Sequence, residues 1–186
     1  LGYEINNATS PPISLGTAAT IIGTSTTWTG ATNTDWATAG NWNGGLPTSA
    51  LNCTINNVAN DPIIASGTQS CKSLTNNGIL TINGGALHIY GSFSNSATLT
   101  QNGFTLSFRE SGTASTQTIT STSALGPIEI LKALGGTVQT GGNVTVTGLT
   151  LATGNTGTFA VKNGHTLTLP TAVTIQAGTF DINGGG

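Results

Sequence analysis

The chain has 186 residues, of which only 5% are charged and 36% are hydrophobic, and its formal net charge is −2. Soluble domains carry roughly 25% charged residues, so Thr, Ser, Asn and Gly must cover most of this surface. Four Lys and Arg residues are too few to form a binding surface for nucleic acid or anionic membranes, and no apolar run approaches the roughly 20 residues that span a bilayer.

The first third of the chain differs from the rest. Residues 1–27 include Pro11 and Pro12 and show no period, which predicts an extended lead-in arm. Residues 28–73 contain all three tryptophans and both cysteines. The end of a repetitive fold must hide the edge of its core, so we interpret residues 28–73 as a Trp-rich N-terminal cap that includes the first coil.

From residue 74 onward, apolar residues alternate with Thr or Ser in short runs that Gly and Asn separate. This period of two is typical of β-strands, and no apolar stripe with helical spacing persists. Asparagines in turn-like contexts recur about every 20 residues, except for one step of twice that length, between the second and the third, which corresponds to two coils with one asparagine missing. Asn and Gly tolerate left-handed backbone angles, which suits one sharp corner per coil. These turn asparagines are Asn83, Asn102, Asn143, Asn163 and Asn183.

A coil of about 20 residues built from short strands is one turn of a parallel β-helix. The sequence therefore predicts an all-β, right-handed parallel β-helix (β-solenoid) over residues 74–186, with its asparagine corners stacked directly over one another. The end of the sequence repeats the motif Ile82-Asn83-Gly84-Gly85. We therefore expect that the solenoid continues beyond it or that a partner caps it.

Several segments of the cap and of the repeats share a recognisable pattern. They are Trp28-Thr29-Gly30, Thr34-Asp35-Trp36, Asn41-Trp42-Asn43, Pro62-Ile63-Ile64, Ser73-Leu74-Thr75 and the stretch from Gly142 to Leu151. These segments resemble the repeat-rich secreted surface proteins of Bacteroidota, which are commonly exported by the type IX system and are often adhesin-like. The resemblance implies a secreted or cell-surface location and a β-helical architecture, and it supplies no catalytic residue.

The two cysteines, Cys53 and Cys71, are separated in sequence by nearly one coil. Stacking in adjacent coils would bring their α-carbons within the roughly 4.4 to 6.8 Å that a disulfide requires, and the expected export route is oxidising. We therefore predict a structural disulfide. A metal site is not expected, because His88 and His165 belong to other coils and Cys-x-x-Cys and His-x-x-His pairs are absent.

The acidic residues are scattered, and we find no nucleophile or phosphate-binding motif. Opposite charges are close in sequence only in Arg109-Glu110 and in Glu129 with Lys132, and we interpret both as surface ion pairs. The sequence thus predicts a protein that is not an enzyme and needs no cofactor. A β-helical polysaccharide lyase is an alternative, because that chemistry needs carboxylates with a nearby Arg or Lys.

Two more hypotheses rest on side chains that could face a ligand. Aromatic rings are platforms for sugars, and among the cap tryptophans Trp36 is the candidate glycan contact, although packing within the cap is the favoured interpretation. Threonine ladders of the kind used by ice-binding solenoids would need Thr-x-Thr pairs at uniform spacing. The pairs occur at Thr98/Thr100, Thr118/Thr120, Thr145/Thr147 and Thr166/Thr168, at unequal steps.

Together these features predict a structural or adhesive β-solenoid module of a bacterial surface. Self-association is expected, either end to end or through residues 1–27 added as a strand to a neighbour, and such contacts would build filaments. Surface glycans are a further candidate partner.

Overall fold

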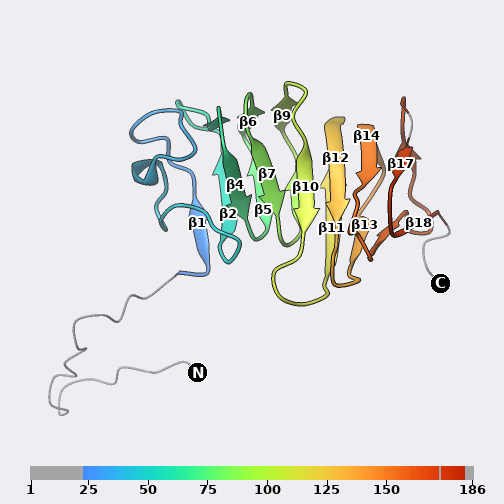
Figure 1. Ribbon diagram of the computed structural model, residues 1–186. Helices are drawn as coiled ribbons and strands as arrows, with labels where there is room; N and C mark the ends of the chain where they lie inside the picture. The colour runs from blue at the N-terminus through green and yellow to red at the C-terminus, as the bar shows by residue number, and fades with distance from the viewer. Residues whose placement is uncertain (1–22, 172, 183–186) are drawn as a thin grey trace, which may run out of the picture.

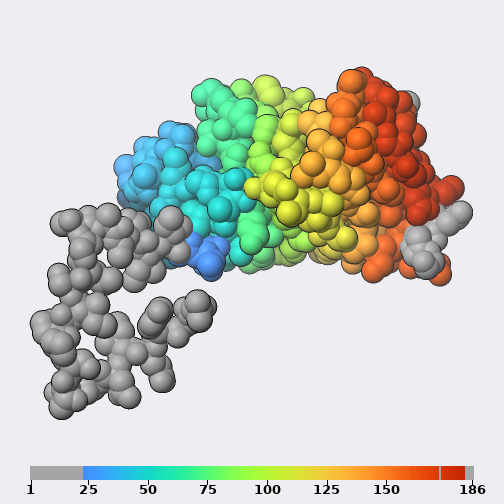
Figure 2. All heavy atoms as spheres, turned by 60° about the horizontal axis from the view of Figure 1, so that its bottom comes forward, coloured from blue at the N-terminus to red at the C-terminus, as the bar shows by residue number. Residues whose placement is uncertain are grey.

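Short parallel strands stack coil upon coil in the computed structural model, which describes residues 23–171 and 173–182 (Figure 1). Within these residues there is no α-helix, and the one 3-10 helix is η1 (Ala39–Asn41). Successive coils follow one another in chain order along the molecule (Figure 2). The predicted all-β parallel β-solenoid is therefore confirmed.

Three sheets form the walls of the solenoid, and all of their strand pairs are parallel. The eight-stranded sheet has, in spatial order, β1 (Ser25–Thr27), β2 (Asn52–Asn56), β5 (Leu74–Asn77), β8 (Phe93–Asn95), β11 (Thr116–Ser121), β13 (Thr137–Thr140), β15 (Thr158–Ala160) and β18 (Thr179–Asp181). The seven-stranded sheet has β4 (Thr68–Cys71), β7 (Ala86–Ile89), β10 (Leu106–Arg109), β12 (Leu125–Leu131) and β14 (Val144–Leu151), and β14 pairs with both β16 (Leu167–Thr168) and β17 (Val173–Ile175). The three-stranded sheet has β3 (Ile63–Ile64), β6 (Ile79–Ile82) and β9 (Thr98–Gln101).

The strand register gives the length of each coil. Cys53 pairs with Leu74, and Leu74 in turn pairs with Phe93, so these two coils are similar in length. The next coil is longer, since Phe93 pairs with Ile119. Residues 110–115, between β10 and β11, lie in this longer coil. Coil length therefore changes little except where a loop is inserted.

Apolar side chains form inward columns because alternate residues of a strand point to opposite faces. One column of the seven-stranded sheet joins Leu87, Leu106, Ile128 and Leu149 by direct register, and all four are buried. Burial of each of these side chains away from water contributes about 1.5 to 3 kcal/mol to the stability of the folded chain. The period of two in the sequence is thus the pattern of a half-buried strand, repeated once per coil.

The structure corrects the predicted asparagine ladder. Asn83 and Asn102 do stack, with Asn102 Nδ2 donating to Asn83 Oδ1 at 2.8 Å, at the corner between the three-stranded and seven-stranded sheets. Asn143 instead lies between β13 and β14, and Asn163 follows β15, so both lie where the chain leaves the eight-stranded sheet. Asn183 lies outside the described residues. Because the coils differ in length, asparagines that are evenly spaced in sequence do not all lie at the same corner of the solenoid.

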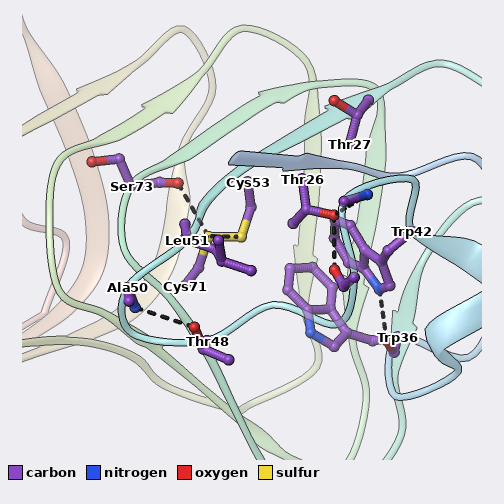
Figure 3. Close-up of a disulfide and its surroundings, with 12 residues drawn as sticks. Thr26, Thr27, Trp36, Trp42, Thr48, Ala50, Leu51, Cys53, Cys71 and Ser73 are labelled. Carbon is purple, nitrogen blue, oxygen red and sulfur yellow. Dashed lines mark hydrogen bonds between the residues drawn. A yellow bond between two sulfur atoms is a disulfide. The ribbon is translucent and has the colours of Figure 1, made fainter. Parts of the chain in front are cut away.

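The N-terminal boundaries also shift. Ser25, Thr26 and Thr27 form β1 and pair with Asn52, Cys53 and Thr54, so these three residues belong to the solenoid and not to the lead-in arm predicted for residues 1–27. The rest of that arm, up to residue 22, lies outside the described residues. The segment between β1 and β2 forms the Trp-rich region, which packs beside the first coil (Figures 1 and 3).

Candidate functional site on the seven-stranded sheet

The predicted disulfide is present between Cys53 and Cys71, with a Cα–Cα distance of 6.1 Å (Figure 3). The spacing of the two cysteines in sequence predicted that they would stack in adjacent coils, but they do not. Cys53 lies on β2 of the eight-stranded sheet and Cys71 on β4 of the seven-stranded sheet, and the register partner of Cys53 is Leu74. The disulfide therefore ties the two large sheets to each other inside the first coil.

The tryptophans of the cap are packing residues. Trp28 and Trp36 are each 1% exposed, and both stand edge-on to Trp42, with ring centroids 5.1 and 4.7 Å away. The Trp42 indole donates to the Trp36 carbonyl at 2.9 Å. A buried ring presents no face to a sugar, so the favoured interpretation of Trp36 as a packing residue is confirmed and the alternative that it contacts a glycan is wrong.

Four of the few charged side chains gather near the ends of β10 and β12, but in pairs that differ from those suggested by sequence. Arg109 Nη2 lies 3.0 Å from Glu129 Oε1, and Lys132 Nζ lies 3.4 Å from Glu110 Oε1. Sequence proximity had paired Arg109 with Glu110 and Glu129 with Lys132. The actual partners are one coil apart in sequence, and neighbouring coils place them side by side.

The Glu110–Lys132 pair is inside the protein, with side chains 3% and 0% exposed, so the prediction that Glu110 and Lys132 each belong to a surface ion pair is wrong. Glu110 accepts backbone N–H groups from Leu134 at 2.7 Å and Gly136 at 2.9 Å, and Lys132 Nζ donates to Ser115 Oγ at 3.2 Å. The carboxylate thus holds the loop that follows β12 in the next coil. These hydrogen bonds satisfy charges that would otherwise be costly to bury.

The pKa values of the buried pair reflect these contacts. Burial by itself raises the pKa of Glu110, but the N–H groups of Leu134 and Ser115 and the ammonium of Lys132 outweigh it, so the net pKa is lowered from its ordinary 4.5. Burial lowers the pKa of Lys132, and the Glu110 carboxylate opposes that shift only in part. Hydrogen bonds to the charged form of a carboxylate favour that form and so lower its pKa, as they do for Glu110.

The Arg109–Glu129 pair lies on the outer face of the sheet, with side chains 27% and 29% exposed. Ser107 Oγ donates to the same Glu129 oxygen at 2.7 Å, and His88 pairs in register with Ser107 on the preceding coil. Burial and the positive charge of Arg109 lower the pKa of His88, against the opposing effect of Glu129. The imidazole is therefore neutral at neutral pH.

An open cavity of about 300 Å³ adjoins this outer pair. Tyr90, at the end of β7, and Arg109, at the end of β10, line it together with the loop after β12. Leu134 of that loop is 52% exposed. The other lining residues are Glu110, Leu131 and Ala133.

A column of hydroxyl groups runs along the outer face of the eight-stranded sheet. Thr54, Thr75, Ser94 and Thr120 follow one another in register across four coils. The Thr-x-Thr pairs singled out from sequence do not form this column together. Thr98/Thr100 lie on β9, Thr118/Thr120 on β11 and Thr145/Thr147 on β14, which belong to three different sheets, while Thr168 lies on β16.

Sequence reasoning missed the polar residues inside the solenoid. Asn76 and Asn95 are buried and stacked, with Asn76 Nδ2 donating to Asn95 Oδ1 at 2.7 Å. Asn95 continues the contact by donating to Ser121 Oγ at 3.0 Å. A sequence separation of one coil between two asparagines is the signal that identifies such pairs. The buried Asn155 likewise accepts from the Lys132 backbone N–H at 2.8 Å.

Within the described ranges no three His, Cys, Asp or Glu side chains come together as a metal site, and no helix there has the length and apolarity to cross a membrane. Comparisons of the chain with protein-family models, curated proteins and solved structures found no match. The functional interpretation therefore rests on the geometry of this chain.

Proposed function

We propose that this chain is a non-enzymatic structural module of a secreted or surface-exposed bacterial protein, in which a stiff solenoid spaces or displays an adhesive surface. Parallel register through successive coils supports this proposal, because the stability of such an array is approximately a sum of coil terms and contacts between neighbouring coils. The disulfide between the two large sheets adds a covalent tie within one coil.

The observation that carries the proposal is that the carboxylates of Glu110 and Glu129 are bound to other groups of the protein. A catalytic carboxylate must reach a substrate, whereas the Glu110 side chain, although it lines the open cavity, is 3% exposed and its oxygens are bound to backbone N–H groups of the next coil and to Lys132. Glu129 reaches the surface, but its Oε1 accepts from both Ser107 and Arg109. Both acids therefore join one coil to the next.

A test of this proposal compares scaffold and enzyme directly. The chain is incubated with uronate-containing and neutral polysaccharides, and new chain ends or unsaturated products are measured, with Glu129→Gln as the matched variant. We expect no product from either protein and full resistance of residues 25–182 to added protease. Polysaccharide cleavage that disappears in Glu129→Gln would overturn the proposal and favour the lyase alternative.

Self-association is part of the same proposal. Removing residues 1–27 would also remove β1 from its sheet, so the informative deletion covers residues 1–22. Electron microscopy of the intact chain should show rods or filaments. If the deleted chain forms the same filaments, the arm has no role in assembly, and if the intact chain stays monomeric at high concentration, the filament proposal fails.

A further inference from the structure

The cavity beside Tyr90 combines side chains from three successive coils. Tyr90 follows β7, Arg109 ends β10, and Leu131 and Leu134 come from the end of β12 and the loop after it. Its volume of about 300 Å³ is at the lower end of the range for small-molecule sites. A cavity of this size, open to solvent, suits one or two rings of a longer ligand.

The lining has the two chemical elements that sugar recognition needs. Tyr90 and the exposed Leu134 offer apolar surface for the C–H face of a pyranose ring. Arg109 also lines the cavity, and its Nη2 bonds to Oε1 of Glu129. A guanidinium has five donors, so Arg109 has donors besides the one bonded to Glu129 that can reach neighbouring hydroxyl groups.

The charge of the cluster selects the class of ligand. Arg109 and Glu129 cancel at the surface, and Lys132 and Glu110 cancel beneath it. The nearby His88 is neutral at neutral pH because burial lowers its pKa. An anionic sugar would need uncompensated positive charge, and a basic ligand would need uncompensated negative charge. A neutral ligand rich in hydroxyl groups meets neither obstacle.

We infer that the cavity formed by Tyr90, Arg109 and Leu134 is a binding subsite for a neutral saccharide. The subsite lies on the seven-stranded sheet, far in sequence from the cap tryptophans. This inference does not depend on the scaffold proposal. A rod without sugar binding would overturn the subsite and leave the scaffold, and an enzyme that binds sugar here would overturn the scaffold and leave the subsite. It also gives the adhesive surface a specific chemistry.

The test is an NMR titration of the full isotope-labelled chain with cellohexaose, xylohexaose and mannohexaose, and with tetragalacturonate as the acidic probe. We expect shifts at the amides of Tyr90, Leu134 and Gly135 with at least one neutral oligosaccharide and none with the uronate. Tyr90→Ala should weaken that binding about tenfold, because it removes the stacking surface. Tyr90→Phe should keep affinity within about twofold.

Two further variants keep the result interpretable. Leu134→Asp alters an exposed side chain and should abolish binding even if Tyr90→Ala proves unstable, whereas Thr75→Ala on the eight-stranded sheet should leave binding unchanged. The inference is overturned if no neutral oligosaccharide shifts these amides at millimolar concentration. It is equally overturned if only the uronate binds or if Leu134→Asp binds the sugar like the unaltered chain. It is also overturned if an apolar peptide binds at these amides and free sugar does not displace it.

Discussion

The two large sheets of the solenoid present outer faces of different chemistry. On the eight-stranded sheet the coils meet through hydroxyl and amide groups, as where Ser96 Oγ donates to Asn77 Oδ1 at 2.9 Å. On the seven-stranded sheet they meet through the Arg109–Glu129 pair, and beneath its edge through Glu110–Lys132. The charges lie where the repeat is interrupted, because Glu110 opens the loop inserted in the coil where Phe93 pairs with Ile119.

This difference indicates what few charges can do in a repetitive fold. Regular coils are held by backbone ladders and inward apolar columns, and the stacked outer positions Thr54, Thr75, Ser94 and Thr120 carry no charge. An inserted loop lacks a strand partner, so its backbone N–H groups need other acceptors. Glu110, the first residue of the inserted loop, accepts the Ser115 N–H within that loop at 3.4 Å and also the Leu134 and Gly136 N–H groups of the following coil. Variants of the two faces should therefore differ sharply in their effect on stability.

The largest effect is expected from Glu110→Gln. The amide keeps the shape of the side chain but leaves the buried Lys132 ammonium without its counter-charge. Breaking a buried ion pair from one side costs about 3 to 5 kcal/mol. Urea unfolding followed by circular dichroism should show that loss. The matched variant Glu129→Gln, on the exposed pair, should lose about 1 kcal/mol or less, and equal losses in both variants would contradict the contrast between them.

Removing the disulfide should have the next largest effect. Cys53→Ala combined with Cys71→Ala opens a loop whose ends are 18 residues apart, and the chain-entropy model values such a loop at about 3 kcal/mol. The loss should be seen in the denaturant midpoint of the double variant. Dithiothreitol should lower the midpoint of the unaltered chain similarly and leave that of the double variant unchanged. A disulfide that contributes nothing would show no difference between reduced and oxidised chains.

Acid should weaken the protein through Glu110. Its pKa is lower in the folded state than the ordinary 4.5, so the unfolded chain takes up a proton first as pH falls. The stability from this group is present above pH 4.5 and is lost as pH falls through the folded-state pKa. The melting temperature should therefore drop in that range, and Glu110→Gln should reduce the drop. An unchanged pH profile in the variant would exclude Glu110 as the cause.

The smallest effect on stability is expected in the hydroxyl column of the eight-stranded sheet. Thr75→Ala removes one hydroxyl from the column of Thr54, Thr75, Ser94 and Thr120, and a surface change away from buried contacts usually stays within about 0.5 kcal/mol. Melting curves measured beside those of Arg109→Gln would compare single side chains on the two outer faces. A larger loss in Thr75→Ala would mean that the hydroxyl column is a stabilising feature in its own right.

Much of the architecture was predictable from local chemistry. Alternation of apolar and hydroxyl residues predicts the strands, and the spacing of the cysteines near one coil led to the correct disulfide. The corner asparagines show the limit of that approach. Asn83 and Asn102 share a corner, but Asn143 falls at another, because the longer offset between Phe93 and Ile119 displaces every later turn.

The polar contacts between coils were harder to predict, because they depend on coil length. Glu110 and Lys132 are about one coil apart in sequence, and so are Asn76 and Asn95. Sequence adjacency nevertheless favoured Arg109 as the partner of Glu110. The burial of Trp36 was predictable from the clustering of the three tryptophans in the cap, although its local sequence after a turn is the same whether the ring faces solvent or packs against another ring.

A double-mutant cycle between Glu110→Gln and Lys132→Met measures most directly whether the buried pair joins neighbouring coils. Coupling energies for residues in one ion-pair network are about 0.5 to 3 kcal/mol, and we expect a value in the upper half of that range, with the double variant more stable than Glu110→Gln alone. Additive losses, with a coupling energy near zero, would contradict the account.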